Sequence, residues 1–218
     1  MANVECLVIV ICDKPQPDYL ILDKLLLSAH YADIEYAVVV NKSDLGNTCL
    51  NYIEREYPFL NNLFSVSAKN GEGVDRLRNF LRGKSVAFAG QSAVGKTSLI
   101  NLLTGSSFLT GKLSDKSGRG KHTTTYSKIL RSDLFSVFDT PGFSELYADI
   151  LPSDIPSNFQ PYEEFVGECR FCDCTHTDEP DCAVKKAVES GVLSEDRYER
   201  YKIIYKEVSA EYKKRYGK

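Results

Sequence analysis

Two short motifs stand in an unusual order along this chain of 218 residues. Residues 41–44 have the pattern N-K-S-D, which recognises guanine, and they precede the glycine-rich segment of residues 90–97. In guanine-nucleotide domains of ordinary connectivity the glycine-rich segment comes first. The reversed order therefore predicts a domain whose chain is circularly permuted, and no other feature of the sequence restricts the fold as strongly.

The glycine-rich segment has the form G-x-x-x-x-G-K-[ST] and is expected to wrap the phosphates of a nucleotide. Its glycines let backbone N–H groups converge on one anion, its lysine adds a positive charge, and its threonine hydroxyl is a typical Mg²⁺ ligand. We expect a buried strand over residues 85–89 and a helix from Lys96, whose dipole would face the phosphates. The predicted nucleotide-binding residues are Gly90, Gln91, Ser92, Ala93, Val94, Gly95, Lys96, Thr97 and Ser98.

Guanine selectivity is predicted from Asn41, Lys42, Ser43 and Asp44. The Asp44 carboxylate can accept hydrogen bonds from two donors of guanine, whereas adenine offers no such pair. The Asn41 side chain is expected to tie this loop to the phosphate loop. A second base-contacting segment, Ser67-Ala68-Lys69, is predicted after a strand over 63–66. The alternative is that both segments are polar turns, but each follows a strand that would end at one ligand-binding edge of a sheet.

Residues that sense the γ-phosphate are expected after the phosphate loop. A strand over 134–138 leads to Asp139, predicted to support Mg²⁺, and to Gly142, whose amide would contact the γ-phosphate. Residues 105–125 are expected to form a mobile switch loop. Thr124 is our choice to complete the Mg²⁺ shell, although the two neighbouring threonines are not distinguished from it.

Hydrolysis itself is expected to be slow without help. Phe143 follows Gly142, at a position where many GTPases carry a glutamine that orients the attacking water. His122 is a candidate to position that water. A histidine in a basic loop could equally contact a partner, and this alternative stays open.

Four of the seven cysteines lie between residues 169 and 182. Cys169, Cys174, His176 and Cys182 supply three thiolates and one imidazole, a set typical of a structural zinc site without an open coordination position. Cys172 also has metal-binding spacing to Cys169, but we interpret it as a spare thiol. With no signal peptide recognised, a disulfide framework is not expected.

Together these motifs resemble the bacterial ribosome small subunit-dependent GTPase A family, whose members are circularly permuted. The matching segments are Gly90-Gln91-Ser92, Val94-Gly95-Lys96, Gly118-Arg119-Gly120, His122-Thr123-Thr124-Thr125, Asp139-Thr140-Pro141-Gly142-Phe143 and the cysteine cluster. The resemblance runs from Ala2 almost to the end and implies GTP hydrolysis late in small-subunit assembly, stimulated by that subunit. It also implies the same four zinc ligands. Ala93 replaces the family's usual glycine, and Thr97 its more common serine.

Two domains are predicted. Residues 1–148 should form a circularly permuted P-loop GTPase domain of the α/β class, with a mostly parallel sheet and helices on both faces. Residues 149–218 should form a small helical zinc-binding domain. The family resemblance implies an OB-fold ahead of the GTPase domain, which this sequence lacks, and a truncated chain and a naturally absent barrel are equally compatible with it.

Net charge and apolar content limit the partners and the cellular location that the sequence predicts. The net charge of −3 argues against a general nucleic-acid binder. Residues 111–131 nevertheless carry six Lys/Arg against one acid, and residues 197–218 carry eight against three. These segments could contact rRNA, with solvated surfaces as the alternative. Apolar runs are too short to span a membrane and no targeting segment is evident, so a cytoplasmic protein is expected. We also expect a monomer.

Three function classes remain. The leading hypothesis is a GTPase that uses GTP with Mg²⁺ and acts as an assembly factor of the small ribosomal subunit. The second is a nucleotide-controlled rRNA-binding module in which hydrolysis is incidental. The third is an ATP-using enzyme in which residues 41–44 match by coincidence, and competition of ATP against GTP would distinguish it.

Overall fold

The computed structural model describes residues 4–105, 129–131, 135–138 and 150–217. They divide into two compact units that do not follow chain order. The first, here called the sheet unit, draws on residues 1–18, 34–55 and 60–143, and the second, the helical unit, on residues 19–33, 56–59 and 144–218. The predicted domains 1–148 and 149–218 stay a prediction.

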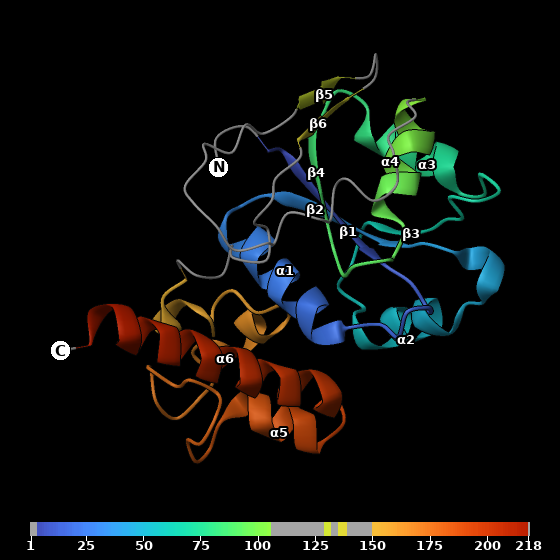
Figure 1. Cartoon of the computed structure of the whole chain (residues 1–218). Coiled ribbons are helices and arrows are strands. Elements are labelled where there is room, and N and C mark those ends of the chain that lie inside the picture. Colours follow the sequence, from blue (N-terminus) through green and yellow to red (C-terminus); the bar gives the residue numbers. More distant parts are fainter. Residues whose placement is uncertain (1–3, 106–128, 132–134, 139–149, 218) are drawn as a thin grey trace. The chain divides into compact units, whose positions relative to one another are not determined.

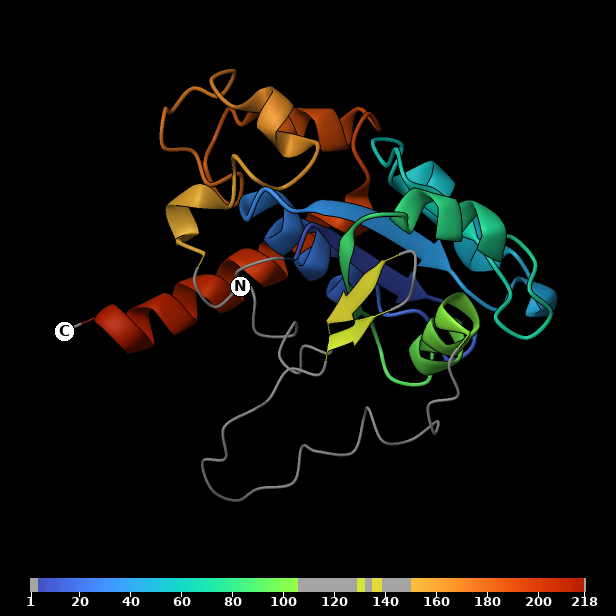
Figure 2. The same ribbon diagram turned by 90° about the horizontal axis from the view of Figure 1, so that it is seen from above.

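The sheet unit contains a six-stranded sheet in the order β3-β2-β1-β4-β6-β5 (Figure 1). Five strands run parallel, and the edge strand β5 is antiparallel to β6 (Figure 2). The strands are β1 (Cys6–Ile11), β2 (Glu35–Val40), β3 (Leu63–Ser65), β4 (Ser85–Ala89), β5 (Ile129–Arg131) and β6 (Ser136–Phe138). Every residue of the central strand β1 is buried, which explains its unbroken apolar sequence. The predicted parallel α/β sheet is confirmed.

Helices in the sheet unit follow the strands closely. They are the 3₁₀ turn η1 (Ser43–Leu45), α2 (Thr48–Glu56), α3 (Val74–Leu81) and α4 (Lys96–Thr104). Apolar residues four positions apart, Leu77 and Leu81 on α3 and Leu99 and Leu103 on α4, share one core cluster with alternate residues of β1. The chain passes from α3 to β4 through the short turn 82–84, where the ends of an unpermuted domain would have been joined.

The helical unit combines early and late parts of the chain. It contains α1 (Tyr19–Tyr31), the 3₁₀ turns η3 (Pro152–Asp154) and η4 (Tyr162–Phe165), α5 (Ala183–Glu189) and α6 (Glu195–Tyr216). Helix α1 packs against α6 (Figure 1). Rings of Phe159, Tyr162 and Tyr201 fill the core, with centroids 4.9 to 5.1 Å apart. Within the described ranges, no helix has both the length and the apolar character needed to cross a membrane.

A buried ion pair connects α1 with α6. The Asp23 carboxylate is fully buried and accepts from Arg197 Nε at 3.1 Å and from Arg200 Nε at 2.5 Å. The Arg197 guanidinium also lies over the rings of Tyr57 and Phe159, at 4.4 and 4.9 Å from their centroids. Two arginines thus compensate one carboxylate that would otherwise be costly to bury.

We expect Asp23→Ala to lower the free energy of unfolding by about 3 kcal/mol, because it leaves the buried guanidinium of Arg197 without its counter-charge. Glu207→Ala is the control, since it removes the more exposed Lys24–Glu207 ion pair between the same helices, and its cost should be about 0.5 kcal/mol. Urea unfolding of both variants tests the prediction, and equal losses would contradict it.

Candidate functional site

Three loops meet at the edge where the parallel strands end. Asn41 follows β2, is 2% exposed, and donates from Nδ2 to the Val94 carbonyl at 2.8 Å. Its Oδ1 accepts from the Ala68 N–H at 3.0 Å. One buried amide therefore joins the N-K-S-D loop, the phosphate loop and the segment after β3.

The backbone of the phosphate loop requires its two glycines. Gly90 has φ 130° and Gly95 has φ 94°, a region that side chains disfavour. A Cβ at Gly90 would collide with the carbonyl of Val10, and one at Gly95 with the Asn41 amide. Ala93 also has a positive φ, 64°, so the alanine that replaces the family's usual glycine adopts a conformation that glycine accommodates more easily.

Lys96 stands at the first position of α4, directly after Gly95. Its Nζ donates to the carbonyls of Gly90 and Gln91, both at 2.7 Å, and burial lowers the pKa of this lysine. The loop thus curls around the ammonium group. Thr97 follows in the first turn of α4, where free N–H groups and the helix dipole favour an anion.

Ser67 and Asp44 are hydrogen-bonded on the side of the edge where base recognition is predicted. The buried Ser67 hydroxyl donates to Asp44 Oδ1 at 2.6 Å, and this hydrogen bond lowers the pKa of Asp44. Lys69 Nζ lies 3.8 Å from the other carboxylate oxygen. An ionised, oriented carboxylate is the acceptor that two guanine donors require.

Lys42 braces the same edge from a left-handed backbone conformation, with φ 65°. Its Nζ donates to the carbonyl of Lys14 at 2.6 Å and to that of Ala93 at 2.8 Å. Sequence reasoning did not anticipate Lys14, because a backbone carbonyl leaves no trace in residue type. The sequence signal that could have pointed to Lys14 was its position shortly after the end of β1.

The remaining predicted residues of the nucleotide site fall outside the described ranges. They are His122, Thr124, Asp139 and Gly142. Their expected roles toward Mg²⁺, the γ-phosphate and the attacking water stay predictions.

Cys169, Cys174, His176 and Cys182 form a group that could hold a metal ion, with all ligand atoms within 4.8 Å of one another. His176 Nδ1 lies 3.5 Å from Cys169 Sγ and 3.4 Å from Cys182 Sγ, and these sulfurs are 3.9 Å apart. Tetrahedral zinc with usual bond lengths gives about 3.6 Å for N···S and about 3.8 Å for S···S. The three distances among Cys169, His176 and Cys182 are close to these values, and the group could hold a metal ion. Cys172 is exposed and lies outside this group.

Burial favours the uncharged forms of Cys174, Cys182 and His176. It raises the pKa of Cys174 to about 12 and also raises that of Cys182, while it lowers the pKa of His176. A bound divalent cation would reverse the preference of the thiols, since thiolates are the ligating form.

Glu179 closes the turn that carries His176. Its carboxylate accepts from the Thr175 N–H at 2.9 Å, the Thr175 hydroxyl at 2.7 Å and the Thr177 N–H at 3.1 Å. Burial by itself raises the pKa of Glu179, but these hydrogen bonds outweigh it and lower the value to about 2. The carboxylate is thus ionised at neutral pH and fixes the turn.

Two tyrosines of α6 support the same turn from the other side. The Tyr198 hydroxyl donates to the His176 carbonyl at 3.0 Å, and the Tyr201 hydroxyl donates to the Thr175 carbonyl at 2.6 Å. Sequence reasoning missed both residues. Their spacing of three on a helix places them on one face, but nothing in the sequence indicated which turn they would meet.

Comparison with known proteins agrees with this architecture. The profile of the RsgA GTPase family matches residues 1–149. The chain belongs to this family. It is 39% identical to the small ribosomal subunit biogenesis GTPase RsgA of Caldanaerobacter subterraneus subsp. tengcongensis, covering 99% of this chain and 75% of the relative. The RsgA protein of Thermotoga petrophila is 38% identical, with coverages of 98% and 75%.

Two solved structures share the fold. The crystal structure of YjeQ from Thermotoga maritima is similar with a TM-score of 0.74 and 35% identity, covering 94% of this chain and 72% of that one. YloQ, described as a circularly permuted GTPase, has a TM-score of 0.75 and 29% identity, with coverages of 95% and 69%. The predicted circular permutation is confirmed.

We expect Asn41→Ala to weaken nucleotide binding by at least about tenfold, because it deletes both hydrogen bonds that join the loops and leaves buried groups unpaired. Titration with a fluorescent GDP analogue measures the effect. Asn61→Ala, at an exposed position of the same unit, is the matched control. Unchanged affinity in Asn41→Ala would show that the loops hold their arrangement without the amide.

We expect Glu179→Gln to reduce zinc affinity by about 10-fold or more, because the amide cannot accept all three hydrogen bonds that fix the His176 turn. Competition with a chromogenic chelator provides the measurement. Glu189→Gln, on the exposed end of α5, should retain the affinity of the unmodified protein. Equal zinc retention by both variants would be evidence against a positioning role for Glu179.

Proposed function

We propose that this protein couples GTP hydrolysis to late maturation of the small ribosomal subunit, and that the subunit stimulates the hydrolysis. The proposal rests on membership of a family whose named relatives are small ribosomal subunit biogenesis GTPases. One observation carries the choice of nucleotide. The Asn41 amide holds a guanine-recognising carboxylate loop and a phosphate loop as one site.

Each described residue of this edge has a proposed role. Asp44, oriented by Ser67, accepts from the two guanine donors, and Ser67-Ala68-Lys69 completes the base pocket. Lys96 leaves the loop carbonyls to contact the β- and γ-phosphates, whose charge offsets its desolvation. Among the described residues, we propose that the Thr97 hydroxyl binds Mg²⁺. Mg²⁺, when bound, neutralises charge that develops on the phosphates.

The need for a stimulating partner is inferred from Phe143. A phenylalanine after Gly142 cannot orient water, so the unassisted reaction should be slow. We propose that the small subunit supplies or orders the missing group, with His122 as the candidate within the chain. The alternative of a nucleotide-controlled rRNA-binding module is favoured by the same residue, because weak hydrolysis could then be incidental.

The end of α6 is the proposed rRNA contact. Arg197 and Arg200 are committed to Asp23, so they do not contribute to the basic surface suggested by residues 197–218. The last two turns still present Lys213, Lys214 and Arg215 between the exposed rings of Tyr212 and Tyr216. Basic side chains neutralise phosphates, and exposed aromatic rings stack on unpaired bases.

Zinc is the proposed metal of the helical unit, with Cys169, Cys174, His176 and Cys182 as ligands. The distances between the ligand atoms support this choice. Four protein ligands leave no position for a substrate, so the ion would stabilise the fold. We further propose that the protein acts as a monomer in the cytoplasm.

We expect GTP turnover by the purified protein to rise by at least about tenfold when small ribosomal subunits are added, because the partner completes the hydrolytic site. Phosphate release measures the rate. Large subunits should leave it unchanged, and a tenfold excess of ATP should not displace GTP.

Different results separate the candidates. Tight GTP binding without stimulation would remove the subunit-activated enzyme from consideration and leave the binding module. For that module, a variant that binds GTP without hydrolysing it should still support assembly. Displacement of GTP by ATP would overturn the guanine assignment itself.

A further inference from the structure

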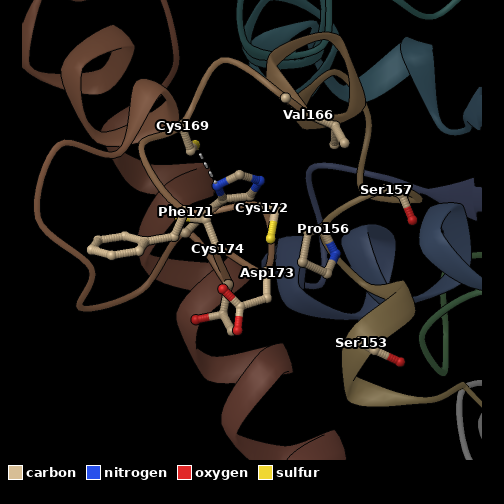
Figure 3. Close-up of a pocket in the computed structure, with 12 residues that line it drawn as sticks. Ser153, Pro156, Ser157, Val166, Cys169, Phe171, Cys172, Asp173 and Cys174 are labelled. Carbon is tan, nitrogen blue, oxygen red and sulfur yellow. Dashed lines mark hydrogen bonds between the residues drawn. The ribbon is translucent and has the colours of Figure 1, made fainter.

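A cavity of about 200 Å³ opens on the helical unit beside the cysteine group (Figure 3). None of the nucleotide-binding residues proposed above lines it. Its walls come from two stretches, residues 153–157 and 166–176. The residues that matter for its chemistry are Ser153, Pro156, Val166, Phe171, Cys172 and Asp173.

Much of the cavity's lining is apolar although it faces solvent. Val166 is 49% exposed, Phe171 is 40% exposed and Cys172 is also exposed, whereas Pro156 lines the cavity from a buried position. His176 also lines the cavity, and its Nε2 is buried without a hydrogen-bond partner among the described residues. An occupant with an apolar side chain would cover the exposed apolar surface.

The charged residues near the cavity indicate which class of molecule it would bind. Residues 150–182 carry eight acids and only one Lys or Arg, Arg170. The Arg170 guanidinium is 3.3 Å from Asp181 and lies over the Phe171 ring at 5.5 Å, so its charge is compensated. The exposed Asp173 stands in the cavity wall, and the exposed Glu168 lies between two lining residues. A phosphate backbone would be repelled here, whereas a cationic chain would be attracted.

We propose that this cavity docks an extended basic protein segment, which places one apolar side chain against Val166 and Pro156. Lysine or arginine side chains on either side of that anchor pair with Asp173 and Glu168. The helical unit then presents two chemically opposite surfaces, an acidic cavity for protein and the basic end of α6 for RNA. The docking site goes beyond the proposed GTPase function and does not depend on it.

The direct test uses the whole zinc-loaded protein and a labelled heptapeptide with a central leucine flanked on each side by three lysines. Fluorescence anisotropy should detect salt-sensitive binding. A peptide with serine in place of leucine should bind at least about fivefold more weakly, because the apolar anchor is missing. A peptide with glutamates in place of lysines should not bind.

Variants locate the site. Asp173→Lys should weaken binding of the leucine peptide by about tenfold, whereas Glu189→Lys, with the same charge change on α5, should change it by less than about twofold. Val166→Ser should weaken the leucine peptide but not the serine peptide. Zinc content of each variant is measured alongside, and Glu168→Lys replaces Asp173→Lys if that variant loses the metal.

Three results would overturn the proposal. Equal effects of Asp173→Lys and Glu189→Lys would mean that the net charge of the protein attracts the peptide, and not the cavity. Equal loss of both peptides in Val166→Ser would remove the anchor from the cavity. Binding of a single-stranded RNA probe that Val166→Ser abolishes would make the cavity an RNA site. GTP turnover is not a readout here, so failure of this docking site and failure of the proposed GTPase function stay distinguishable.

Discussion

The side-chain amide of Asn41 is the interaction on which the nucleotide-binding edge depends. It donates to the Val94 carbonyl of the phosphate loop and accepts from the Ala68 N–H after β3, so one side chain holds three loops together. These contacts are set by position in the sheet and not by order in the chain. A permutation can therefore move the guanine-recognising loop ahead of the phosphate loop without disturbing the site.

The helical unit relies on a comparable buried polar contact. Asp23 on α1 is held by Arg197 and Arg200 on α6, which ties the first helix of the chain to the last. The same unit carries the cysteine group. The turn that holds His176 is fixed by hydrogen bonds to the Glu179 carboxylate and from the hydroxyls of Tyr198 and Tyr201 on α6. Each of these devices compensates a buried charge or a buried polar atom with specific partners, which stabilises one arrangement over alternatives.

Local pattern predicted most elements of the fold. The expected strand over 85–89 coincides with β4, and the helix expected from Lys96 begins at that residue as α4. Apolar spacing is strong in these stretches, so propensity and burial agree. The expected strand over 63–66 is one residue shorter in the structure, where β3 is Leu63–Ser65, because strand ends lack a sharp signal.

By itself the sequence determined the family, the permuted order, the glycines of the phosphate loop and the four grouped metal-binding side chains. These depend on residue types at short spacing, where geometry follows from local bonding. Only the tertiary structure decided that α1 belongs with the last helix and that Arg197 and Arg200 of the basic tail pair with the buried Asp23. A charge looks the same in sequence whether it faces water or a carboxylate far along the chain, because burial is set by contacts between distant segments.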